Sequence, residues 1–126
     1  MTADEWLAAE FSRCWPWLDD ALNASPMRTH DKEHIWAGIQ SGELELWPTP
    51  NSACVIQITT YPTGLKVLHG LLAGGRLSEI KTTVLALENR ARELGCHYAA
   101  PQGRIGWLRA LPGYRRAYTV MAKELT

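Results

Sequence analysis

The sequence lacks the features that mark membrane, secreted and disulfide-stabilised proteins. No apolar run approaches the roughly 18 to 20 residues that a membrane helix needs. Residues 1–15 are acidic where a secretory signal would be basic. The three cysteines, Cys14, Cys54 and Cys96, are odd in number and far apart, which argues against a disulfide framework. We therefore expect a cytoplasmic protein with reduced thiols and no membrane partner.

The motifs of several common chemistries are also missing. There is no G-x-S-x-G elbow for a serine nucleophile and no G-x-x-x-x-G-K-S/T loop for nucleotide phosphates. His30 and His34 are four residues apart, but no cysteine or third ligand lies close to them in the sequence. These absences argue against a serine hydrolase, a P-loop enzyme and a metal centre.

The length of 126 residues fits one domain, and the net charge of zero hides two unequal halves. Residues 1–75 carry four Lys or Arg and nine Asp or Glu, a balance of −5. Residues 76–126 carry nine and four, a balance of +5. Two interpretations stay open: the halves attract each other across the fold, or the basic half meets the phosphates of a cofactor or nucleic acid.

Helical periodicity dominates the first third of the chain. Residues 4–15 place apolar side chains at intervals of three and four, and the stripe continues to Leu22. Pro16 should kink or restart this helix, because proline lacks the amide donor and crowds the preceding turn. Thr29 is the expected cap of a second helix, which Gly42 should end.

The period then changes from helix to strand. Residues 43–48 alternate between glutamate and leucine before Pro48, and residues 51–62 give a second strand after a short turn. Residues 65–75 are apolar on both faces, as in a central strand that is covered on both sides. Gly70 within it suggests a bulge or a close backbone approach. The short loops predict an antiparallel meander of three strands.

A crossover follows the meander. Residues 78–95 show the strongest helical pattern in the chain, with Ser78 as the expected cap and Gly95 at the end. Residues 96–101 form a short strand, which the crossover should place parallel to residues 65–75. Residues 106–111 can form one or two helical turns, and residues 117–125 give a final strand. The order α-α-β-β-β-α-β-α-β describes an α+β domain.

This order resembles the GNAT superfamily of N-acetyltransferases. More narrowly, the stretches WAGIQSGELELW and GCHYAAPQGRIGWLRALPGY are similar to small acetyltransferase-like proteins encoded by bacteriophages and prophages. The most specific piece comprises Gly103, Arg104, Gly106, Trp107, Arg109 and Leu111, with Gly113 and Tyr114 beyond. The resemblance implies one GNAT-like domain over residues 1–126: an N-terminal helical segment at 1–30 and an acetyltransferase-like core at 31–126. It implies a mixed sheet, made of the meander and the β-α-β crossover, after two N-terminal helices.

The resemblance also implies acetyl-CoA as cofactor, held by the loop between the central strand and the next helix. The usual loop reads Gln or Arg, two residues, Gly, one residue, then Gly or Ala. Here the stretch is AGGRLSEIK, so the spacing departs from that pattern, and Glu79 would compete with a phosphate. The alternative is an ordinary strand-to-helix turn with a capping serine. The candidate cofactor-binding residues are Leu72, Gly74, Gly75, Arg76 and Ser78.

The proton-transfer residues of the superfamily are harder to place. Its members often use a tyrosine four residues before a Gly-aromatic pair, and Arg109 stands there in this sequence. His69 on the expected central strand is the candidate general base, with His97 behind it. The alternative is that His69 is a hydrogen-bonded core residue. The catalytic motif is degraded or absent, so enzymatic activity stays open.

Two kinds of function remain at this stage. In the first, the protein is an acyl-CoA-dependent N-acetyltransferase, with Arg104, Trp107, Arg109 and Tyr114 shaping the pocket for an acceptor amine. In the second, the fold has lost catalysis and acts as a binding or virion-assembly protein through a tryptophan-rich surface. An open cleft between the central strand and residues 96–100 would favour the first, and a cleft plugged by Trp107 or His69 the second.

The partners follow from the same residues. Trp6, Trp15 and Trp17 would form the tryptophan-rich surface for a protein partner, since aromatic residues are enriched at interface centres. The arginines among Trp107 and Tyr114 are also a pattern that tracks nucleic acid. An isoelectric point near 6.9 argues against a dedicated nucleic-acid binder. A homo-oligomer stays open.

Overall fold

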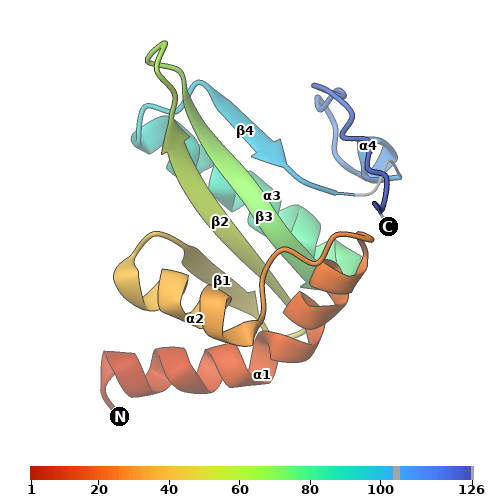
Figure 1. The fold of residues 1–126 in the computed structure, drawn as a ribbon. Helices are drawn as coiled ribbons and strands as arrows, with labels where there is room; N and C mark the ends of the chain where they lie inside the picture. Colours follow the sequence, from red (N-terminus) through yellow and green to blue (C-terminus); the bar gives the residue numbers. More distant parts are fainter. Residues whose placement is uncertain (104–105, 126) are drawn as a thin grey trace.

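The computed structural model describes residues 1–103 and 106–125, which fold into one mixed sheet with helices on both faces (Figure 1). Helices α1 and α2 lie on one face of the sheet, and α3 lies on the other. The elements in chain order are α1 (Ala3–Asn23), α2 (Lys32–Ser41), β1 (Glu45–Thr49), β2 (Ser52–Thr60), β3 (Lys66–Gly75), α3 (Leu77–Glu93), β4 (Tyr98–Pro101) and α4 (Trp107–Ala110).

The sheet has the strand order β1-β2-β3-β4. β1, β2 and β3 are antiparallel neighbours, so the predicted meander is confirmed. β4 lies parallel to β3, and α3 makes the connection between them, as the predicted crossover requires. The α+β class with a mixed sheet is therefore confirmed.

An irregularity interrupts β3 near its middle. Val55 of β2 faces Leu72, but the next residue, Ile56, faces Gly70, so Leu71 is an extra residue on β3. A Cβ atom on Gly70 would lie 3.1 Å from the Cα atom of Pro101 in β4. Gly70 thus allows β3 and β4 to approach each other closely, as its place in a strand suggested.

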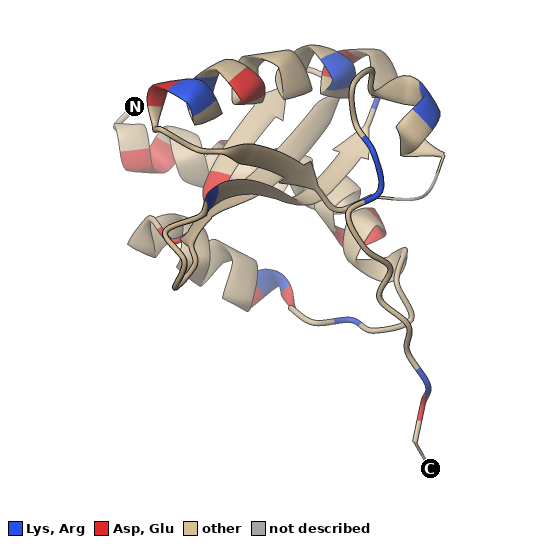
Figure 2. Ribbon diagram, turned by 90° about the horizontal axis from the view of Figure 1, so that it is seen from above, with Lys and Arg blue, Asp and Glu red and all other residues tan. Residues whose placement is uncertain are grey.

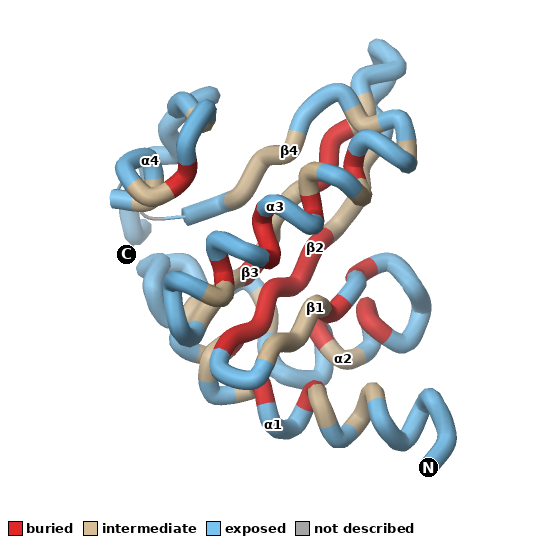
Figure 3. Tube along the Cα trace, turned by 180° about the vertical axis from the view of Figure 1, so that it is seen from behind, coloured by how far each residue is buried: buried red, intermediate tan, exposed pale blue. Residues whose placement is uncertain are grey.

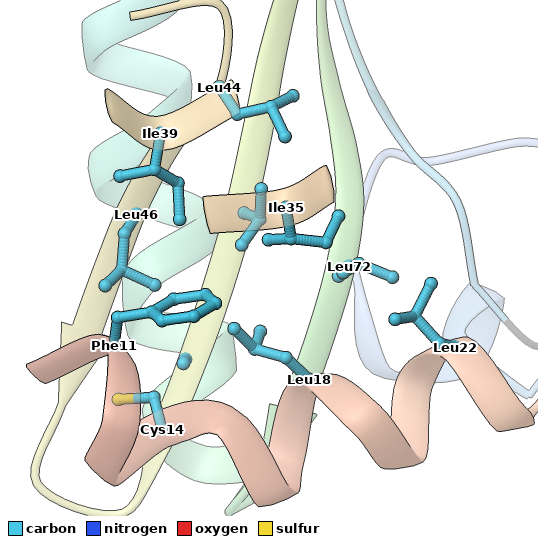
Figure 4. Packing of buried hydrophobic residues seen from close by; sticks show 11 residues of the cluster. Phe11, Cys14, Leu18, Leu22, Ile35, Ile39, Leu44, Leu46 and Leu72 are labelled. Carbon is cyan, nitrogen blue, oxygen red and sulfur yellow. The ribbon is translucent and has the colours of Figure 1, made fainter. Parts of the chain in front are cut away.

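The first core cluster lies between the sheet and the two N-terminal helices (Figure 4). Leu18 of α1 and Ile35 of α2 are fully buried there, beside Leu72 of β3. α1 continues through Pro16 and changes direction part-way along its length, which agrees with the predicted kink (Figure 1). The bend lets one helix follow the twisted sheet from β1 to the end of β3.

The opposite face of the sheet packs on α3. Ile56 and Leu68 meet Leu87 and Ala91 in one cluster, and Cys54 meets Ile80 and Val84 in another. Seen from this side, burial is concentrated along β2 and the inward side of α3 (Figure 3). Residues 53–56 of β2 and the end of β3 at Leu72 are therefore covered on both faces, which explains why the sequence is apolar there.

Two predicted helix caps were each wrong by two residues. α2 begins after Asp31 rather than at Thr29, and the Asp31 amide donates to Nδ1 of His34 at 3.0 Å. α3 begins after Arg76 rather than at Ser78, and the Ile80 amide donates to the Arg76 carbonyl at 3.1 Å. In α3 the start is set by the end of β3 at Gly75, so the capping serine lies inside the first turn.

The predicted final strand over residues 117–125 was also wrong. After the single turn of α4, residues 114–125 have no regular structure, and they lead away from the sheet (Figure 2). A strand forms only where a neighbour satisfies its backbone groups, and this path leaves β4 behind. Within the described ranges, no helix combines the length and apolarity needed to cross a bilayer.

Candidate functional site

The candidate site lies where β3 and β4 separate. The two strands pair from Val67 with Tyr98 to Gly70 with Pro101, and the Gln102 amide then donates to the Gly70 carbonyl at 2.8 Å. β3 continues to Gly75, and none of the described residues pairs with it on this side. The backbone from Leu71 to Gly75 therefore offers an edge that leads to the start of α3 (Figure 1).

The far end of that edge carries opposing charges. The Arg76 side chain is 65% exposed, and its Nε lies 3.8 Å from a carboxylate oxygen of Glu79. The other Glu79 oxygen accepts a bond from the Asn51 amide at 2.9 Å. Desolvation raises the pKa of Glu79, but the bond from Asn51 and the neighbouring Arg76 outweigh it and lower the pKa. The first turn of α3 thus presents a cation and a carboxylate side by side.

The two glycines at this end have internal reasons to be glycine. A Cβ atom on Gly74 would collide with the backbone carbonyl of Trp17 in α1. Gly75 has a φ of +105°, and a Cβ atom there would collide with the Asn51 carbonyl. At both glycines the neighbour that approaches closely is therefore the protein's own backbone. This agrees with the alternative interpretation, in which the stretch is an ordinary strand-to-helix turn.

His69 lies two positions before the separation of the strands. Leu68 packs toward α3, so His69 points to the opposite face, beside Ala100 of β4. Its Nε2 atom is 2.9 Å from the Tyr61 hydroxyl, and the two rings meet edge to face with centroids 6.1 Å apart. α1 and α2 cover β1, β2 and the end of β3, so β4 and the start of β3 extend beyond them on this face (Figure 1).

The sequence did not single out Tyr61. It follows β2 at the hairpin, and side-chain alternation places it on the same face as Gln57, the pairing partner of His69. The contact between Tyr61 and His69 could therefore be predicted once the register of the hairpin was known. The sequence alone left that register undetermined.

Three residues of the predicted acceptor pocket, Trp107, Arg109 and Tyr114, lie in or just after α4. Trp107 and Tyr114 pack with Leu111 against Ala73, Cys54, Ile80 and Val84. Arg109 is exposed, and Arg104 lies outside the described residues. These aromatic side chains therefore fill the α3 side of the separation, so the open cleft expected of an acyltransferase is closed by Trp107 on that side. His69 faces the other side.

Tyr114 is anchored rather than free. Its hydroxyl donates to a carboxylate oxygen of Glu88 at 2.8 Å. Burial and this bond raise the pKa of Tyr114 well above its ordinary value. Beside it, a cavity of about 20 Å³ remains between Gly70, Pro101 and Tyr114. Tyr114 is thus a neutral hydrogen-bond donor that ties the end of the short helix to α3.

The remaining candidates are structural. Trp15 packs on Phe11 and Trp17 lies under Arg13, and both tryptophans are half-buried, so Trp6 alone of the three is exposed, at 50%. Two of the three tryptophans of the proposed surface are therefore partly buried against the core. Burial raises the pKa of the Cys54 thiol to about 11. In the part of the chain that the structure describes, no three His, Cys, Asp or Glu side chains are grouped to hold a metal ion.

Comparison with known proteins identifies the architecture. No protein-family model and no curated protein matches the sequence. The structure is similar to the crystal structure of an acetyltransferase from Trypanosoma brucei, with a TM-score of 0.58. This chain shares the fold of that protein. The two sequences are 16% identical, and the match covers 84% of this chain and 89% of the trypanosomal one. Such a match extends over nearly the whole domain, so the GNAT-like fold inferred from the element order is supported.

Proposed function

We propose that this protein is an N-acyltransferase that takes its acyl group from acetyl-CoA or a closely related thioester. The observation that carries the proposal is the separation of β3 and β4 after Gly70 and Pro101, within an acetyltransferase fold. The unpaired edge from Leu71 to Gly75 is complementary to a ligand with amide groups along its length. The pantetheine arm of CoA is such a ligand.

The residues at the end of the edge fit the remainder of the cofactor in part. Arg76 is exposed and can pair with a diphosphate, and Ser78 and the first turn of α3 offer further donors. Leu72 packs in the core, so its backbone is the part that can reach the ligand. Gly74 and Gly75 shape the turn, while the Glu79 carboxylate weakens the attraction for phosphate.

The bound thioester would supply a carbonyl carbon for attack by an amine. His69 is placed to accept the proton that the amine loses, because it lies on the uncovered face beside the separation of the strands. Tyr61 holds one ring nitrogen of His69 and thereby orients the ring. Arg109 at the exposed end of α4 is the remaining charged group that can contact an acceptor.

Calorimetric titration with acetyl-CoA tests the proposal, with ATP as a comparison ligand. We expect micromolar binding of acetyl-CoA that weakens about tenfold in Arg76→Ala, in line with the loss of one charge-assisted bond to phosphate. Arg90→Ala is the matched control, since Arg90 is on the same helix but in its last turn. Absence of heat and of a thermal shift at millimolar acetyl-CoA would overturn the proposal.

If binding is found, release of CoA in the presence of polyamines and peptide amines tests the transfer itself. Acylation of an amine would support the enzyme, and tight binding without acylation of any amine would leave a CoA-binding protein instead. A bacteriophage or prophage origin stays a prediction from the sequence resemblance.

A further inference from the structure

The segment after Tyr114 exposes large apolar side chains close together. Tyr118, Val120, Met121 and Leu125 are 71, 66, 90 and 85% exposed. The chain here leads away from the sheet instead of folding over it (Figure 2). Soluble monomers seldom expose that much apolar surface in one short stretch, and when they do it marks an interaction site.

The composition of this segment is that of a strand. Residues 117–121 read Ala-Tyr-Thr-Val-Met, which includes three residue types enriched in strands, and no proline or glycine occurs from 115 to 125. Its backbone groups have no regular partner in the structure. A segment with this composition becomes a strand as soon as a sheet edge is offered to it.

β4 offers such an edge. It pairs with β3 on one side, and no described strand pairs with its other side. Proteins usually protect an edge strand with charges or a bulge, but β4 has Tyr98, Ala99 and Ala100, with Pro101 only at its end. Tyr98 is 58% exposed and could pack on an added strand.

The segment begins beside this edge. Tyr114 is tied to Glu88 and lines one small cavity together with Ala99, Ala100 and Pro101. From that fixed point the chain departs from its own β4. A two-fold axis close to Tyr114 would therefore lay the segment of each copy along β4 of the other copy.

We propose that two copies of this chain exchange residues 117–125, each adding a fifth strand to the sheet of the other. The exchange covers the exposed apolar side chains and the open edge in one step. Both copies contribute the same surface, so the assembly closes at a dimer. This inference is independent of the proposed acyl transfer.

Light scattering combined with hydrogen exchange tests the exchange. We expect a mass of twice 14.1 kDa for the full chain and slow exchange of the amides of residues 117–124. The double variant Val120→Asp with Met121→Asp should be a folded monomer with fast exchange in this segment, because it places charges on both faces of the added strand. Lys123→Ala is the control and should remain a dimer.

Three results would overturn the proposal. A monomer with protected amides at 117–124 would show that the segment pairs within its own chain. A monomer with unprotected amides at 117–124 would show that no strand pairs with this segment. A dimer that survives the double variant would place the interface elsewhere. Since the changed side chains are exposed, the circular dichroism of the variant should match that of the unchanged protein, which separates loss of assembly from loss of folding.

Discussion

At the scale of single residues, His69 and Tyr61 form the one histidine–tyrosine pair joined by a hydrogen bond in the described part of the chain. A histidine that serves as a base needs one nitrogen available and a fixed ring orientation. In the tautomer in which Nε2–H of His69 donates to the Tyr61 oxygen, Nδ1 carries the free lone pair that can take a proton. A hydrogen-bonded ring is part of both interpretations of His69, so its role as a base stays a prediction.

The first prediction concerns this pair. His69→Gln should lower kcat for acyl transfer about 100-fold or more, the usual contribution of a general base. Tyr61→Phe should lower kcat only about three- to tenfold and leave KM for acetyl-CoA unchanged, because the hydroxyl orients His69 and does not touch the cofactor. Steady-state release of CoA measures both.

The matched control is His30→Gln, which changes a histidine that precedes α2. Equal kcat in His69→Gln and in the unchanged protein would remove His69 from the mechanism. A rise in KM with constant kcat in Tyr61→Phe would assign Tyr61 to cofactor binding instead.

The second prediction concerns Glu79. Glu79→Gln keeps an oxygen that can accept from Asn51 but removes a negative charge beside Arg76, so acetyl-CoA should bind about three- to tenfold more tightly. Calorimetry measures the change in affinity. An unchanged affinity would show that the diphosphate does not bind beside the first turn of α3.

The same variant should change the dependence of stability on pH. The fold lowers the pKa of Glu79 from its ordinary value of 4.5. The ionised carboxylate therefore stabilises the folded state at pH values above that ordinary pKa. This contribution is lost as the pH falls through the lowered pKa. The difference in melting temperature between Glu79→Gln and the unchanged protein should therefore shrink in acid. A difference that is constant with pH would show that ionisation of Glu79 does not cause it.

At the scale of elements, the packing of α1 on β3 decides which residues the turn before α3 can contain. Gly74 lies directly under the backbone of Trp17, and Pro16 bends α1 at that place. The glycine pair therefore serves the contact between helix and strand as well as the turn. From the sequence this pair was a candidate phosphate-binding turn with a departing spacing, because glycine is favoured for close approach whether the neighbour is a ligand or the protein itself.

The third prediction follows from this contact. Gly74→Ala should lower the free energy of unfolding by about 1–3 kcal/mol, the cost of forcing a methyl group into a packed space. Gly106→Ala is the control, since a Cβ atom there would meet nothing within 4 Å and its φ is −61°. Urea unfolding measures both, and equal stability of the two variants would contradict the contact.

Periodicity and turn residues were enough to predict most of the elements. The stripe from Leu7 to Leu22, the alternation before Pro48 and the long apolar pattern from Ile80 to Leu94 each report a local period. The cap of α3 was missed because it depends on where β3 stops, and β3 stops where Asn51 crowds Gly75. The strand at 117–125 was predicted wrongly because composition shows what a segment can form, while a neighbouring strand decides whether it does.

The site was less predictable than the fold. Leu72, Arg76 and His69 could be proposed from the sequence because they lie on or just after one apolar strand, and their roles stay predictions. Tyr61 was not found, because its approach to His69 depends on the register of the β2–β3 hairpin. Contacts between neighbouring strands follow from pairing, which a single sequence does not specify.

At the scale of the whole molecule, the charges of the two halves do not neutralise each other through ion pairs. Each salt bridge among the described residues joins partners from the same half, such as Arg28 with Asp19 or Arg92 with Glu88. Direct ion pairs between the two halves therefore do not explain the charge balance in the described residues, although Lys and Arg are frequent in the second half (Figure 2). Whether this half meets an anionic ligand stays a prediction.

The short pairing of β4 also has a consequence for the order of folding. β1, β2 and β3 are joined by tight turns, whereas β4 reaches β3 only after the whole of α3 has been crossed. Contacts between residues near in sequence close first, because they cost less chain entropy. The meander should form in the transition state and β4 should dock afterwards.

The fourth prediction tests that order. Val55→Ala in β2 should mainly slow folding, whereas Ala100→Gly in β4 should mainly speed unfolding. Stopped-flow chevron plots in urea measure both rates, and slower folding in the β4 variant would contradict the order. If the order holds, β4, which lies at the candidate site, is the last strand of the sheet to assemble and the first to detach. A long ligand would then enter where β4 detaches from β3, and this detachment is the reverse of the last folding step.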